Sequence, residues 1–126
     1  MSSLPITSVV TASLALLMVG LAFATVMKRV ATGQAWGDGG DLALQRTIRA
    51  HAHLVEYAPW FLLVLGLLEV RGTSRTALLV MAAAFVASRV IYLVYSFVRQ
   101  AVPLRIVGFW SSALPIAVGA VWLLVA

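Results

Sequence analysis

The chain has 126 residues, of which 63% are hydrophobic and 10% charged, and its mean hydropathy is +1.04. A soluble domain of this size could not bury so much apolar surface, so the composition excludes a soluble globular protein and indicates an integral membrane protein. The absence of cysteine excludes disulfides, thiolate metal sites and a cysteine nucleophile. The net charge of +5 does not indicate nucleic-acid binding, because the basic residues lie at helix ends, in short loops or inside apolar segments.

Four apolar segments are each long enough to cross a membrane, which takes about 20 helical residues for a hydrocarbon core of about 30 Å. Lipid offers no hydrogen-bond partners to the backbone, so each segment is predicted to be a helix. We therefore predict an all-α fold with one domain over residues 1–126, an integral membrane four-helix bundle with up-and-down topology. The predicted helices cover residues 4–27, 42–70, 76–98 and 106–126.

The first apolar segment contains Ala22-Phe23-Ala24, which is similar to a signal-peptide cleavage site. However, residues 1–8 contain no Lys or Arg, and the apolar run is longer than the core of a usual signal peptide. We expect this segment to be retained as the first helix. A loop over residues 28–41 follows and ends at Asp41, a good N-cap for the second helix.

The basic residues of the loops predict an orientation. Because four helices place both termini on one side, the first and third loops share the other side. That side carries Lys28, Arg29, Arg99 and Arg105, against Arg71 and Arg75 on the side of the termini. By the positive-inside rule, the first and third loops are predicted to be cytoplasmic and the termini to lie on the opposite side. The expected location is an inner or plasma membrane.

One face of the second helix carries a stripe of polar side chains. Ionisable groups at membrane depth are costly and are normally kept where they face protein, water or a ligand. At about 100° per residue, the members of this stripe fall within an arc of about 100°. They are Arg46, Arg49, His53, Glu56, Tyr57 and Trp60. The stripe therefore predicts a binding site at the cytoplasmic end of this helix.

The charged members of the stripe allow both structural and ligand-binding roles. Glu56 could form an ion pair with Arg46, Arg49 or Arg89, and it could also receive the amino group of a ligand. The planar guanidinium of Arg49 suits a carboxylate. Arg46 lies nearer the interface, where its side chain could equally extend into the headgroup region.

The two histidines do not predict a metal site. His51 lies on a different helix face from His53, so a regular helix cannot bring both to one ion. His53 and Glu56 supply at most two ligands, and no second His/Glu helix completes the set.

Further candidate residues come from the third and fourth helices. Arg89, Tyr92, Ser96 and Arg99 lie within about 80° on one face of the third helix, and Tyr95 lies at its edge. Arg89 is deep in the segment and is expected to have a partner, either Glu56 or a carboxylate of another protomer. Arg105, expected just before the fourth helix, could be an interfacial anchor or could hold a thiolate.

The residues of the second helix resemble a known signature. The run Arg46-Thr-Ile-Arg49-Ala-His-Ala-His53-Leu-Val-Glu56-Tyr57-Ala-Pro59 is similar to that of MAPEG proteins, the membrane-associated proteins in eicosanoid and glutathione metabolism. The pattern of that family is Arg-x-x-Arg-Ala-x-x-Asn-x-x-Glu-Tyr-x-Pro. The four-helix layout and the chain length are also similar, so the resemblance covers essentially the whole chain.

The resemblance implies a homotrimer that binds glutathione between neighbouring protomers. It places glutathione-binding positions of the family at Arg49, Glu56 and Tyr57, and at Arg89 and Tyr92 in the third helix. With two further members of the stripe, the candidate glutathione-binding residues are Arg46, Arg49, His53, Glu56, Tyr57, Arg89 and Tyr92. Arg105 resembles the arginine credited with stabilising the glutathione thiolate, and it is our candidate catalytic residue.

Two departures from the family pattern concern specificity. The Asn of the pattern is His53 here, and the second tyrosine of the eicosanoid-synthesising members falls at Ser96, with Tyr95 one residue early. These differences weaken the expectation of an eicosanoid substrate more than that of glutathione binding. The implied second substrate is a lipophilic small molecule or lipid.

Three functions follow as hypotheses. The first is a membrane-bound glutathione-dependent transferase or peroxidase acting on lipophilic electrophiles or lipid hydroperoxides. The second is a non-catalytic membrane subunit or lipid-binding scaffold of the same fold. The third is a small transporter that uses Glu56 to couple protons to efflux, which the arginine-rich stripe disfavours.

Overall fold

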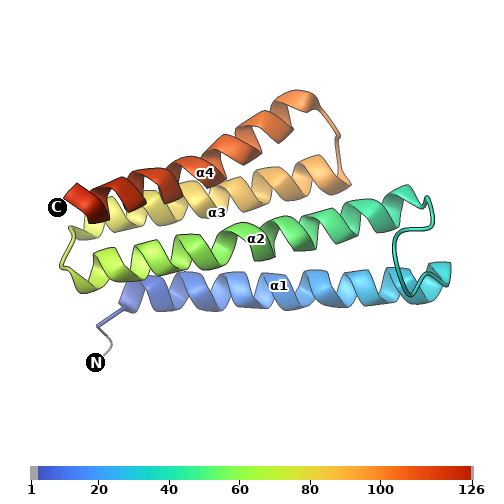
Figure 1. The fold of residues 1–126 in the computed structure, drawn as a ribbon, viewed down its shortest axis with the longest axis horizontal. Coiled ribbons are helices and arrows are strands. Elements are labelled where there is room, and N and C mark those ends of the chain that lie inside the picture. The colour runs from blue at the N-terminus through green and yellow to red at the C-terminus, as the bar shows by residue number, and fades with distance from the viewer. Residues whose placement is uncertain (1–2, 126) are drawn as a thin grey trace.

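The computed structural model describes residues 3–125, which form four helices connected by short loops (Figure 1). The helices are α1 (Pro5–Thr32), α2 (Leu42–Val70), α3 (Arg75–Phe97) and α4 (Val102–Val125). All four are long and apolar enough to cross a membrane. The predicted four-helix membrane bundle is confirmed, and the start of α1 and the end of α4 lie at the same end of the bundle.

The predicted bounds are right for α2 and within one residue for α3, but they are wrong for α1 and α4. Helix α1 continues past residue 27 and ends at Thr32, with Gly33 as its C-cap. The φ of Gly33 is 69°, and its N–H donates to the carbonyl of Arg29. Helix α4 begins at Val102 because Pro103 lies in the first turn, where its missing N–H removes no helical hydrogen bond. Arg105 therefore lies in the first turn of α4 and not before it.

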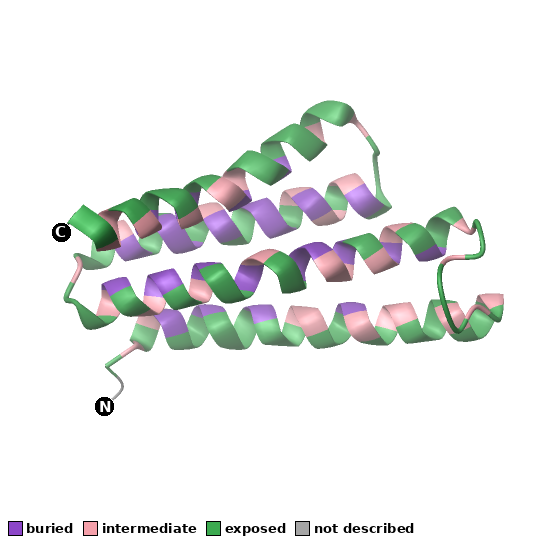
Figure 2. Ribbon diagram, viewed as in Figure 1, coloured by how far each residue is buried: buried purple, intermediate pink, exposed green. Residues whose placement is uncertain are grey.

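The core of the bundle lies around α2 and α3. The rings of Phe61 and Phe85 are fully buried there and stack with centroids 4.2 Å apart. Helix α1 packs chiefly against α2, and α4 packs against α3 and α2. The outer faces of α1 and α4 are exposed over much of their length (Figure 2), as expected for surfaces that face lipid or another protomer.

A carboxylate of α2 fixes the start of α1. Glu69, in the last turn of α2, accepts hydrogen bonds from the backbone N–H groups of Ile6 and Thr7, at 3.0 and 2.9 Å. Amide groups in the first turn of a helix have no partner within the helix, and a negative charge there also complements the helix dipole. Glu69 thus sets where α1 begins against α2.

Helix α4 is close to the bundle along one half and diverges along the other (Figure 1). At Gly119, a Cβ atom would collide with the side chains of Val64 and Met81, so only glycine permits this approach. Toward its N-terminal end, α4 moves away from α2, and the side chains of Ile106 and Trp110 are exposed. This divergence opens the space that holds the candidate site.

Candidate functional site

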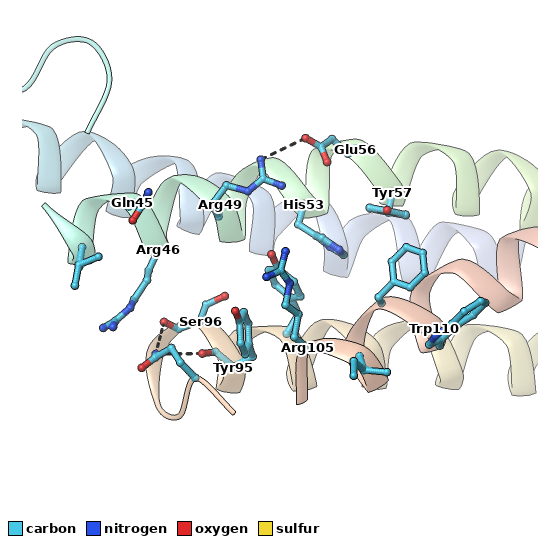
Figure 3. Close-up of a pocket in the computed structure, with 15 residues that line it drawn as sticks. Gln45, Arg46, Arg49, His53, Glu56, Tyr57, Tyr95, Ser96, Arg105 and Trp110 are labelled. Carbon is cyan, nitrogen blue, oxygen red and sulfur yellow. Dashed lines mark hydrogen bonds and ion pairs between the residues drawn. The ribbon is translucent and has the colours of Figure 1, made fainter. Parts of the chain in front are cut away.

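A pocket of about 710 Å³ lies between α2, α3 and α4, at the end of the bundle where α4 diverges (Figure 3). Its walls combine charged, polar and aromatic side chains with a few aliphatic ones. From α2 come Leu42, Gln45, Arg46, Arg49, His53, Glu56 and Tyr57. From α3, α4 and the residues between them come Tyr92, Tyr95, Ser96, Gln100, Arg105, Ile106, Phe109 and Trp110.

The pocket gathers most of the candidate residues. Five of the six members of the α2 stripe line it, together with Tyr92 and Arg105. Both Tyr95 and Ser96 line it as well. The sixth member of the stripe, Trp60, does not line the pocket, and its side chain is exposed. The pocket lies at the end of the bundle that carries the first and third loops, as the position of the stripe predicted.

Four lining residues that matter for the shape of the pocket were not identified from sequence. Phe109 and Trp110 lie about one helical turn after Arg105, and this spacing could have indicated that they accompany it. Gln45 directly precedes Arg46 in the first turn of α2. Gln100 follows α3, and its amide donates to the carbonyls of Tyr95 and Ser96 at 3.2 and 3.1 Å; no sequence pattern marks it.

Arg49 and Glu56 form an ion pair along α2, with 3.8 Å between Nη1 and Oε1. Each side chain is 54% exposed, and no other salt bridge forms within residues 3–125. An exposed ion pair contributes little to stability, about 0–1 kcal/mol. The two charged groups can therefore separate at small cost to meet a ligand that carries both an acidic and a basic group.

The expected pairing of Arg89 with Glu56 is wrong. Arg89 is buried, with 3% of its surface exposed, and it donates to His53 Nδ1 at 2.6 Å. It also donates to Ser88 Oγ at 3.2 Å and to Ser112 Oγ on α4. Glu56 lies on the exposed side of α2, whereas Arg89 is enclosed between α2, α3 and α4. For the same reason Arg89, a candidate ligand contact, does not line the pocket.

His53 lies at the base of the pocket between two tyrosines. Its ring stacks on that of Tyr57, with centroids 4.4 Å apart, and on that of Tyr92, at 3.9 Å. Tyr57 in turn meets the ring of Phe109 edge-on at 6.4 Å. These contacts join α2, α3 and α4 and give the pocket an aromatic base. His51, predicted to lie off the stripe, does not line the pocket.

The charge balance of the pocket favours an anionic ligand with one basic group. Three guanidiniums (Arg46, Arg49 and Arg105) face one carboxylate, that of Glu56. Arginine binds carboxylates through paired hydrogen bonds, and a carboxylate binds an ammonium. Within residues 3–125 no group of three or more His, Asp or Glu side chains could hold a metal ion. Because the chain has no cysteine, a sulfur nucleophile in this pocket must come with the ligand.

Comparison with known proteins identifies the family of this chain. The sequence profile of the MAPEG family matches residues 7–125. The chain is also similar to the inner membrane protein YecN of Escherichia coli K12 and to its counterpart in Escherichia coli O6:H1, with 31% identity over 78 residues in each case. These matches cover 62% of this chain and 60% of each relative. No solved structure shows a significant match. Since the family profile covers nearly the whole chain, this four-helix membrane protein belongs to the MAPEG family.

Proposed function

We propose that this protein is a membrane-bound glutathione-dependent transferase or peroxidase that acts on lipophilic electrophiles or lipid hydroperoxides. The observation that carries the proposal is the lining of the pocket, with three arginines and one glutamate around an aromatic base. Glutathione has two carboxylates, one ammonium and one thiol, so it offers one complementary group for each of these charges. The volume of about 710 Å³ lies within the range of small-molecule sites, about 300–1,000 Å³.

Binding would use the α2 side of the pocket. Arg46 and Arg49 bind the two carboxylates, and Glu56 leaves its ion pair with Arg49 to bind the ammonium. The exposure of that pair supports this exchange, because neither charge is held by a buried network. Tyr57 and Tyr92 line the same pocket, and their hydroxyl groups can donate to the peptide carbonyls.

The chemistry requires a thiolate, and Arg105 is the residue proposed to stabilise it. A free thiol has a pKa of about 8.5, and a nearby cation lowers that pKa by favouring the charged form. Arg105 extends from α4 into the pocket across from α2 (Figure 3). Arginine stays protonated, so it acts as a fixed positive charge.

The thiolate then reacts in one of two ways. With an electrophile, its sulfur forms a bond to carbon and the leaving group departs with the bonding electron pair. With a lipid hydroperoxide, the sulfur attacks the terminal oxygen and the O–O bond breaks. This gives an alcohol and a sulfenic acid, which a second glutathione converts to the disulfide and water.

The second substrate would enter from the bilayer beside α4. Ile106, Phe109 and Trp110 line the pocket and are also exposed on the outer surface of the chain. An apolar pocket wall that also faces lipid suits a lipophilic substrate. The thiolate and this substrate would then meet between the lipid and the charged residues of the pocket. The name of the similar Escherichia coli proteins supports placement in the inner membrane. The distribution of basic residues supports a pocket that opens to the cytoplasm.

The proposal is tested with purified protein in detergent or nanodiscs. Isothermal titration with glutathione measures binding, and turnover with a chloronitrobenzene electrophile and with a lipid hydroperoxide measures the two reactions. Arg99→Ala is the matched control, since Arg99 is an exposed arginine at the same end of the bundle that does not line the pocket. We expect binding and at least one turnover reaction, unchanged in the control. Binding without turnover would favour the non-catalytic scaffold, and the absence of binding would contradict the proposal.

A further inference from the structure

The contact between His53 and Arg89 restricts how His53 can meet a ligand. Tyr57 and Tyr92 cover the two faces of the imidazole, so only the edges of the ring can form hydrogen bonds. One edge, at Nδ1, lies 2.6 Å from Nη1 of Arg89. The residue as a whole lines the pocket, whereas Arg89 does not. The edge that carries Nε2 is therefore the one available to a ligand.

The chemistry of the two groups decides where the proton of His53 lies. A guanidinium has five N–H donors and no acceptor. A hydrogen bond from Arg89 therefore requires a lone pair on Nδ1, and a neutral imidazole with an unprotonated Nδ1 carries its one proton on Nε2. In a doubly protonated ring, or in the tautomer protonated on Nδ1, the N–H at Nδ1 would point at the N–H of Arg89 Nη1, and no hydrogen bond could form.

Arg89 is itself held in place from three sides. Besides His53, it donates to Ser88 on its own helix and to Ser112 on α4. Its guanidinium carbon lies 5.1 Å from the ring centroid of Phe85 and 5.7 Å from that of Tyr92. Only 3% of the residue is exposed, so it cannot turn away from His53 without breaking these contacts.

We infer that Arg89 is a positioning residue that fixes His53 as the tautomer protonated on Nε2, so that His53 presents only a hydrogen-bond donor to the pocket. The ligand group that meets His53 is then an acceptor, such as a carboxylate or a peptide carbonyl. An ammonium or hydroxyl donor is disfavoured there. The identity of the ligand as glutathione rests on the proposed function, but the tautomer of His53 does not.

The tautomer is measured first, on ligand-free protein labelled with ¹⁵N-histidine, by long-range ¹H–¹⁵N correlation spectra at pH 7.5. The chain has two histidines, so His51→Gln assigns the signals and His51 serves as an internal reference. We expect a proton on Nε2 and none on Nδ1 of His53 in the wild-type protein. A proton on Nδ1, or a doubly protonated ring, would overturn the inference without any variant.

Two substitutions test whether Arg89 is responsible. Arg89→Lys keeps a donor and should keep the Nε2–H tautomer. Arg89→Met removes the donor and should give a mixture of the two tautomers. A single Nε2–H tautomer in folded Arg89→Met protein would show that Arg89 does not fix it. If Arg89→Met does not fold, the wild-type and Arg89→Lys spectra still decide the tautomer.

A second arm measures glutathione affinity by titration calorimetry. His53→Asn preserves the polarity, because the amide oxygen can accept from Arg89 while the amide nitrogen donates to the ligand, so its affinity should stay near that of the wild type. His53→Leu removes the donor and should weaken binding about tenfold, as expected for one hydrogen bond to a charged group. Equal affinities of His53→Leu and the wild type would overturn the donor role. If the wild type binds no glutathione, the proposed function fails while the tautomer is still decided by the spectra.

Discussion

At the scale of single residues, two kinds of charged group lie in and behind the pocket. Arg89 is buried and donates hydrogen bonds to His53 and to two serines, so it belongs to the framework of the site. Arg49 and Glu56 are half exposed and bound only to each other. Charges at membrane depth are costly, so we propose that a ligand or another protomer completes the site at this loosely held pair.

Substitution of this pair should weaken glutathione binding. In Arg49→Ala a carboxylate of the ligand loses its guanidinium, and in Glu56→Gln the ammonium loses its counter-charge. A hydrogen bond to a charged group contributes about 1.5–3 kcal/mol, so each change should weaken affinity by about tenfold or more. Titration calorimetry measures the affinity, with Arg99→Ala as the control. Wild-type affinity in both folded variants would place glutathione elsewhere.

Substitution of Arg105 should separate chemistry from binding. Lowering the pKa of a thiol by one unit takes about 1.4 kcal/mol, which is within reach of one cation in a partly dry pocket. In Arg105→Ala we therefore expect most of the glutathione affinity to be kept and kcat to fall by about tenfold or more. Steady-state turnover and calorimetry are measured on the same preparation. If the kcat of Arg105→Ala equals that of the wild type, another residue activates the thiol of glutathione.

At the scale of helices, the pocket exists because α4 packs closely against α2 and α3 near its C-terminal end and diverges from α2 toward its N-terminal end. Gly119 allows close contact with α2 and α3 near the C-terminal end of α4, and the divergence begins toward the N-terminal half of the helix. Packing at Gly119 therefore contributes to the shape of a pocket that lies nearer the other end of the same helix.

Two glycine substitutions test this view of α4. In Gly119→Ala the new methyl group would collide with Val64 and Met81, and we expect a loss of about 1–3 kcal/mol in stability, typical of overpacking. In Gly20→Ala, on α1, nothing lies within 4 Å of the new methyl group. That change should be neutral or stabilising by up to about 1 kcal/mol, because alanine favours the helix. Unfolding in mixed micelles with increasing sodium dodecyl sulfate measures both, and equal stabilities would contradict the packing argument.

Helical periodicity made most of the site predictable. The α2 stripe was predictable because spacing alone sets which residues share a face, and five of its members line the pocket. The contact of Arg89 with His53 was not, because it depends on how α3 rotates against α2. The same limit applies to Glu69, whose partners are backbone groups more than 60 positions away in the sequence.

At the scale of the whole molecule, the single chain leaves much apolar surface and part of its site open. Helix α1 contacts α2 closely and α3 slightly, and α4 not at all among the described residues. The pocket is bounded by α2, α3 and α4, with the Arg49–Glu56 pair half exposed. A neighbouring protomer that covers this opening would shield the pair from lipid, which is the physical reason to expect a shared site.

We therefore predict a homotrimer. Native mass spectrometry in mild detergent, supported by chemical cross-linking, should show three copies. If glutathione binds between protomers, as we propose, it should also raise the fraction of trimer. A monomer that binds glutathione with full affinity would contradict the shared site, while leaving the lining of the pocket within one chain unchanged.

The central claim is that this pocket holds glutathione as a thiolate, and one spectrum tests it directly. The ultraviolet difference spectrum of glutathione mixed with the wild-type protein should show the thiolate band near neutral pH, below the ordinary thiol pKa of about 8.5. The band should disappear on addition of a lipophilic electrophile, as product forms. If glutathione in the presence of the protein titrates as it does in free solution, the account of this site as a glutathione-dependent enzyme is wrong.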